Sequence, residues 1–229
     1  MSSTLAMLLA DSRLPVGAHV TSNALEAALR TELEPAQVGD YLTSRMLTVV
    51  PVEAGTAVVA RQLGLLSPRA PTAPEDARIE HLHAEWAART PSRAQREITV
   101  ALGDGLRRLA DVLWPGAVPA AGLPRPIVLG LIAAAAGLGA ADLVRLVAYD
   151  DAQTVVAAGL KLEPSDPRAA TRLVLEACVR LEPQVAALAA LTDPAQIPCT
   201  GAPLTEGWAE AQTQLPRRLF EAPWVSFRS

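Results

Sequence analysis

Apolar residues recur at helical spacing along most of this 229-residue chain, and no stretch shows the strict apolar–polar alternation of a half-buried strand. The stretch 93–113 illustrates the pattern, with Ile98, Leu102, Leu106, Leu109 and Leu113 spaced three or four residues apart. Half of the chain is hydrophobic, and it is rich in Ala and Leu, which favour helices, and poor in aromatic residues. The sequence therefore predicts an all-α fold with a sizeable buried core.

Proline-rich stretches mark the expected connections between helices. Residues 67–76 hold three prolines, which predicts a surface connection, and residues 114–126 form the longest break. Neither of the halves beside that break looks self-sufficient, because both are heavily apolar. We therefore expect a single-domain multi-helix bundle over residues 1–192, followed by an irregular, Pro/Gly-rich C-terminal tail over residues 193–229.

Several residues predict where individual helices begin. Pro35 suits the first turn of a helix, Pro51 interrupts the apolar pattern, and Ser92 can cap the helix that follows it. Asn23 followed by Glu26 has the spacing of a capping box.

Charge and hydropathy exclude several classes of partner. The net charge of −4, with Lys161 as the sole lysine, argues against nucleic acid, which calls for a basic face. Residues 127–141 carry no charge, but this run of 15 residues falls short of the roughly 20 that span a membrane, so a buried core helix is expected. Because the N-terminus lacks the basic region of a signal peptide, we expect a cytoplasmic protein with Cys178 and Cys199 reduced.

Phosphate-binding and metal-binding motifs are missing from the sequence. Neither of the common glycine-rich phosphate loops occurs, and there is no C-x-x-C pair. His81 and His83 form the one close histidine pair, but residues two apart on a helix point to different faces. A structural or solvent-exposed role is therefore favoured over metal binding.

Candidate catalytic residues are equally sparse. Ser12 or Ser22 could act as a nucleophile with His19, but no G-x-S-x-G elbow is present to expose the serine. Asp150 and Asp151 form an acidic pair, yet adjacent helical residues diverge by about 100°, so they are not expected to share one site. One is expected to face solvent and the other to cap or pair. Binding to another macromolecule is thus favoured over catalysis.

The C-terminal tail concentrates aromatic side chains that are rare elsewhere. Four of the eight aromatic residues, Trp208, Phe220, Trp224 and Phe227, lie in the last 22 positions. Apolar anchors in a polar tail fold onto the chain's own body or onto a partner. A partner interface is favoured because Leu219 and Phe220 stand beside Arg217 and Arg218, as in interface hot spots.

The stretch "LADSRLPVGAHVTSNALEAAL", residues 9–29, closely resembles the N-terminal signature of the urease accessory protein F family. The matching positions are Asp11, Ser12, Leu14, Pro15, Gly17, Ser22, Leu25 and Glu26. Weaker matches follow in the family's order, at Ser92, Arg93, Gln95, Pro126, Gly130, Ala158, Leu160, Leu162, Pro164, Arg218, Leu219 and Phe220. The resemblance covers about residues 5–221, and its shared order is what makes it persuasive.

This chain departs from the family pattern at four positions. Asn23 and Ala24 replace two glycines, and Arg96 replaces the glycine after Gln95. Ala209 replaces a histidine that precedes a glutamate near the C-terminus. Nine residues also follow Phe220, past the usual end of the family.

The resemblance implies an all-α protein that forms a homodimer and has no catalysis of its own. Family members bind accessory protein D or H, chiefly through the C-terminal segment, and with it recruit the GTPase accessory protein G. The complex delivers nickel to apo-urease, and the ion is not held tightly by this chain. The expected partner-binding residues are Asp11, Ser12, Pro15, Gly17, Ser22, Glu26, Arg217, Arg218, Leu219 and Phe220.

Three alternatives remain open. A nickel-binding metallochaperone could use His19, His81 or His83, although there is no Cys/His cluster. The chain could instead be a generic helical oligomerisation module. The opening stretch alone could be a plain helix–turn–helix joint, since turn chemistry suffices to explain Pro15 and Gly17.

Overall fold

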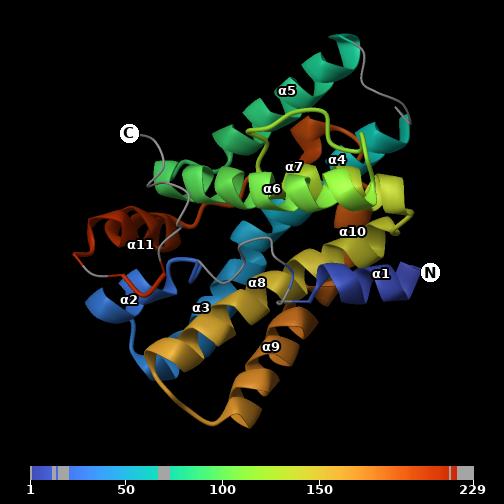
Figure 1. Ribbon diagram of the computed structural model, residues 1–229. Helices are drawn as coiled ribbons and strands as arrows, with labels where there is room; N and C mark the ends of the chain where they lie inside the picture. Colours follow the sequence, from blue (N-terminus) through green and yellow to red (C-terminus); the bar gives the residue numbers. More distant parts are fainter. Residues whose placement is uncertain (1, 12–13, 15–20, 67–72, 217, 221–229) are drawn as a thin grey trace.

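The computed structural model describes residues 2–11, 14, 21–66, 73–216 and 218–220, and within these ranges it contains helices and no strand (Figure 1). This confirms the predicted all-α fold. The α-helices are α1 (Ser2–Leu9), α2 (Leu25–Thr31), α3 (Val38–Leu47), α4 (Val49–Leu66), α5 (Ala73–Ala88), α6 (Arg93–Leu113), α7 (Arg125–Ala136), α8 (Ala140–Leu162), α9 (Pro167–Leu181), α10 (Val185–Ala189) and α11 (Pro203–Gln214). Three short 3-10 turns, η2 (Pro35–Gln37), η3 (Glu182–Gln184) and η4 (Pro194–Gln196), complete the described elements.

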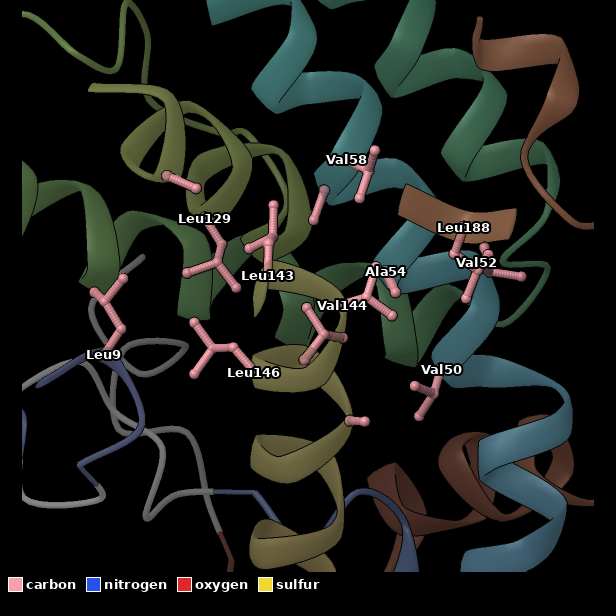
Figure 2. Packing of buried hydrophobic residues seen from close by; sticks show 14 of the residues in the cluster. Leu9, Val50, Val52, Ala54, Val58, Leu129, Leu143, Val144, Leu146 and Leu188 are labelled. Carbon is pink, nitrogen blue, oxygen red and sulfur yellow. The ribbon is translucent and has the colours of Figure 1, made fainter. Parts of the chain in front are cut away.

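The core is built around α4, which packs against α7 and α8. Figure 2 shows Val52, Val58, Leu129 and Val144 among the side chains that converge there from these three helices. The expected buried core helix is confirmed for α7, but the apolar run 127–141 is divided, because Gly137 ends α7 with a φ of 74°.

Several predicted helix starts are confirmed. Pro35 opens η2, which leads into α3, and Ser92 caps α6 by accepting a hydrogen bond from the Gln95 N–H. Thr48 separates α3 from α4, so Pro51 falls in the first turn of α4, where its missing N–H is tolerated. The predicted face of α6 holds for Leu106, which is buried, but Leu113 is exposed.

The predicted capping box at Asn23 is wrong. The residue before α2 is Ala24 in the left-handed region, and the Glu26 N–H donates to the Ser22 hydroxyl oxygen instead. Asn23 is occupied elsewhere, since its side-chain amide donates to Asp151. The serine therefore caps this helix from one position earlier in the chain.

The C-terminal region contains a helix that the sequence did not lead us to expect. Helix α11 packs against α2 and α6, and Thr205 and Ala209 are buried there. The end of the described chain then returns to α2. In Figure 1, α11 and α2 lie next to each other at one side of the molecule.

One described stretch, Pro35–Leu66, is long and apolar enough to cross a membrane by length and composition alone. In the fold, 56% of its most apolar window is buried inside the protein, as in the core helix of a helical bundle. The stretch is also divided at Thr48 into α3 and α4.

Candidate functional site

Glu26 joins α2 to the C-terminal end of the described chain. Its carboxylate is fully buried and accepts hydrogen bonds from the backbone N–H groups of Leu219, at 2.8 Å, and Phe220, at 3.2 Å. The Gln212 side chain donates to it at 2.9 Å, and Arg30 forms an ion pair with it at 2.8 Å. A buried charge needs such partners, so this carboxylate holds the C-terminal segment, residues 215–216 and 218–220, against α2.

Helix α11 is fixed to the body by two further polar residues. The side-chain amide oxygen of Gln212, Oε1, accepts from the Ala27 N–H at 2.9 Å. Glu210 accepts from the Ser92 hydroxyl at 2.6 Å and from the Ala94 N–H at 3.0 Å, at the N-terminus of α6. The hydrogen bond from Ser92, with that from Ala94, lowers the pKa of Glu210 below its usual value, as expected for a carboxylate at a helix N-terminus.

A cavity of about 460 Å³ lies beside these attachments. Its walls come from α4, α6, α8, α11 and the C-terminal segment, which contributes Arg218 and Phe220. Ile98 and Leu102, from the predicted apolar face of α6, line it and are only partly buried. The volume is in the range of small-molecule sites.

Two ion pairs line the cavity on the side formed by α8. Arg45 of α3 donates to both carboxylate oxygens of Asp151, and Arg125 of α7 lies 3.0 Å from Asp150. Burial raises the pKa of Asp150, although Arg125 opposes the shift. The expectation that one of these two aspartates faces solvent is wrong, because both are paired and both line the same cavity.

Glu53 of α4 also lines the cavity. Its carboxylate accepts one hydrogen bond, 2.9 Å long, from the indole N–H of the fully buried Trp86. Burial raises the pKa of Glu53 to about 7, and the hydrogen bond from Trp86 offsets part of that shift.

Comparison with known proteins decides the family. A family model described as UreF matches residues 33–178. The urease accessory protein UreF of Mycobacterium sp. (strain JLS) is 35% identical over 228 residues, which cover 95% of this chain and 97% of that protein. The protein of the same name from Mycobacterium marinum is 34% identical over 203 residues, 84% of this chain and 90% of that protein. This chain belongs to the UreF family of urease accessory proteins.

The departures from the UreF pattern have structural consequences in this chain. Asn23 and Ala24, at the two glycine positions, have φ angles of 50° and 68°. Glycine adopts this region without strain, asparagine tolerates it, and alanine is disfavoured there. The Arg96 side chain donates to the Thr90 and Pro91 carbonyl oxygens in the connection between α5 and α6, and Ala209 is buried.

The structure brings together part of the expected partner-binding set. Ser22, Glu26, Arg218, Leu219 and Phe220 lie around the junction of α2 with the C-terminal segment or line the cavity. Asp11 is half-buried just after α1. Ser12, Pro15, Gly17 and Arg217 lie outside the described residues.

The two apolar anchors of the C-terminal segment differ. Phe220 is 6% exposed and docks on the chain's own body, which was the alternative considered for this pair, whereas Leu219 is 56% exposed. Of the two, only Leu219 offers an open apolar side chain in this conformation. Partner binding through the segment stays a prediction.

Sequence reasoning missed Glu53, Gln212 and the joint role of Asp150 and Asp151. In the sequence, Glu210 stands out only as the glutamate that follows Ala209. No local spacing signals these roles, since each contact joins residues far apart in the chain, such as Gln212 and Glu26.

The histidines show no shared site. His81 is exposed, and His83 is half-buried with its ring centre 5.7 Å from that of Trp86, where burial lowers the pKa of His83. Within the described ranges, no three His, Cys, Asp or Glu side chains gather as a metal site would require. His19 falls outside those ranges.

Proposed function

We propose that this chain is a non-catalytic scaffold in urease maturation, which binds accessory protein D or H and, with it, the GTPase accessory protein G. Membership of the UreF family supports an accessory role. The observation that supports binding of these partners is the contact at Glu26, whose carboxylate accepts hydrogen bonds from the backbone N–H groups of Leu219 and Phe220. This contact joins the opening stretch that resembles the family's N-terminal signature to the C-terminal match at Arg218, Leu219 and Phe220.

These hydrogen bonds favour a binding role because they fix the C-terminal segment. Two backbone N–H groups fixed by one carboxylate hold the segment in a defined conformation, which lowers the entropy lost when a partner docks on it. Leu219, which is 56% exposed, is then available as an apolar anchor, and Arg218 precedes it in the sequence. Apolar and arginine side chains of this kind are typical of interface hot spots.

The wider proposal follows the family. In the cytoplasm, a homodimer of this chain regulates the GTPase partner, and the complex delivers nickel to apo-urease. Nickel is cargo here and is not held tightly by this chain. The two carboxylates that are adjacent in the sequence and line the cavity, Asp150 and Asp151, are each paired with an arginine, which supports this weak role for the metal.

Co-purification tests the scaffold proposal. The full-length chain is expressed with accessory proteins D and G from the same source, alongside a Leu219→Asp variant and a chain truncated before Leu215. Val112→Asp is the matched control, because Val112 is 76% exposed at the far end of α6. We expect the wild type and the control to form the complex, and both changes at the C-terminal segment to lose it.

A different result would overturn the proposal. If Leu219→Asp retains the complex as well as the wild type does, the exposed anchor is not the contact. If no variant binds while the isolated chain retains nickel through dialysis, the metallochaperone alternative replaces the scaffold.

A further inference from the structure

The carboxylate of Glu53 stands out among the charged groups of the cavity. Around it, Arg45 is paired with Asp151 and Arg125 with Asp150, so these four side chains form two neutral pairs. Glu53 has the Trp86 indole as its hydrogen-bond donor, and no basic side chain of the described ranges lies within ion-pair distance of it. Among the described residues its negative charge has no ion-pair partner, and the same holds for Glu206, whose carboxylate accepts from the Ala202 N–H at the N-terminus of α11.

The described lining of the cavity as a whole also carries an excess of negative charge. Among the described residues that line it, carboxylates outnumber guanidinium groups by one. A buried anion that is not neutralised raises the energy of the folded protein, and a cation entering from solvent lowers it again. The raised pKa of Glu53 agrees with this, because burial makes the carboxylate favour a proton when no other cation is present.

The rest of the cavity is apolar enough to bind a carbon chain. Val52, Ile98, Leu102 and Phe220 contribute to its lining. A cavity of about 460 Å³ accommodates far more than a bare ion. Shape and lining thus fit a guest with one charged end and an apolar stem.

We propose that this cavity binds an organic monocation, a primary ammonium or guanidinium group on an apolar stem, with its charged end on Glu53. A lysine or arginine side chain of a docked protein and a free alkylammonium share this chemistry. The inference goes beyond the scaffold function, since it holds for the isolated chain whether or not the accessory proteins bind. A divalent metal fits poorly, because Arg45 and Arg125 already occupy the neighbouring carboxylates.

The test uses hexylammonium, 1-hexanol and hexanoate, titrated into the full chain at pH 8 by calorimetry. At this pH Glu53 is ionised, because its pKa lies near 7. Glu53→Gln removes the charge and keeps an oxygen for Trp86. Glu97→Gln is the matched control, since Glu97 also lines the cavity but forms an ion pair with Arg93.

We expect hexylammonium to bind the wild type and Glu97→Gln alike, and to bind Glu53→Gln about tenfold more weakly. Hexanol should bind more weakly than hexylammonium and equally to all three proteins. Thermal unfolding at pH 8 checks that Glu53→Gln is folded. A titration with Nα-acetyl-lysine methylamide then distinguishes the two sources of the charged group. Binding of this compound indicates a lysine side chain of a docked protein, whereas binding of hexylammonium alone indicates a free amine.

Three results would overturn the proposal. Equal binding of hexanol and hexylammonium to the wild type would make the cavity merely apolar. Tighter binding of hexanoate would show that the arginines dominate. Displacement of hexylammonium by equimolar nickel chloride would make Glu53 part of a metal site.

Discussion

Two interfaces between helices of this protein are held by different kinds of contact. The contact of α4 with α7 is apolar and so close that a Cβ atom at Gly130 would lie 2.2 Å from the Ala57 carbonyl oxygen. The contact of the C-terminal region with α2 and α6 depends instead on hydrogen bonds to Glu26, Glu210 and Gln212. The α4–α7 interface is thus a packed core, whereas the C-terminal region is attached mainly by polar contacts that water can replace.

The difference separates what holds the fold from what can change in it. Opening the α4–α7 contact would expose apolar surface and leave a cavity, which amounts to unfolding. Releasing the C-terminal segment exchanges hydrogen bonds that water or a partner can also supply, at about 1–3 kcal/mol each. The position of the C-terminal segment can therefore change without unfolding the core.

The largest effect is expected at Gly130. Gly130→Ala places a methyl group 2.6 Å from the Ala60 Cβ atom as well as against the Ala57 carbonyl oxygen. The helices must separate, which should lower the free energy of unfolding in urea by about 3 kcal/mol.

Gly207→Ala is the control for this measurement. Gly207 lies in α11, and a Cβ atom there meets nothing within 4 Å. That change should raise stability by about 0.5–1 kcal/mol through helix propensity. Equal effects of the two substitutions would show that the α4–α7 contact is looser than we describe.

Loss of the Glu26 charge should release the C-terminal segment without unfolding the core. In Glu26→Gln, the side-chain amide presents a donor toward the backbone donors of Leu219 and Phe220. We expect their hydrogen exchange to accelerate by about thirtyfold, equivalent to about 2 kcal/mol. Exchange from the centre of α4 should be unchanged.

Glu32→Gln serves as the control, because Glu32 is exposed at the end of α2. It should leave the Leu219 and Phe220 amides as protected as in the wild type. If Glu26→Gln slows or spares their exchange, the segment is held by Phe220 packing and not by the carboxylate.

The contrast between the interfaces also explains what the sequence could predict. Apolar spacing predicts the helices and the buried face of α3, because Tyr41, Leu42 and Met46 repeat at the helical period. The same logic could not place Glu53 or pair Asp151 with Arg45, since 106 positions separate that pair. Polar contacts between distant residues leave no periodic signal.

The family resemblance reached part of what spacing could not. It marked Glu26 and Phe220 as important, but it could not show that they meet or that Phe220 is buried. Asn23 was misread as a cap because its spacing to Glu26 fits a capping box. The two glycines of the family pattern, which Asn23 and Ala24 replace, are the better signal, since glycine is typical of the positive φ found there.

Glu53, which lines the cavity, should make the stability of the protein depend on pH. The pKa of Glu53 is raised to about 7 in the folded protein, above its ordinary value near 4.5. The folded state thus binds the proton more tightly than the unfolded state, so this residue makes stability fall as pH rises from about 4.5 to 7. The charged groups acting on it are Arg45, Arg125 and Asp151.

Glu53→Gln should remove that fall. At pH 8 the variant should be more stable than the wild type by about 2 kcal/mol in urea, and near pH 4.5 the two should match. Glu97→Gln, at an exposed ion pair, should follow the wild-type curve. Parallel curves for the wild type and Glu53→Gln would show that Glu53 is well solvated.

The smallest effect is expected at Ala24, at the joint before α2. Its φ of 68° disfavours alanine by about 1 kcal/mol, and glycine relieves this at the expense of a methyl group that is only 9% exposed. Ala24→Gly should therefore raise the free energy of unfolding by about 0.5 kcal/mol. Ala28→Gly, inside α2 with ordinary helical geometry, should lower it by about 1 kcal/mol, so opposite signs from the same substitution would locate the strain at the joint. If both changes destabilise, the left-handed conformation of Ala24 is supported by its packing, and the glycine pair of other family members serves some purpose other than relief of backbone strain.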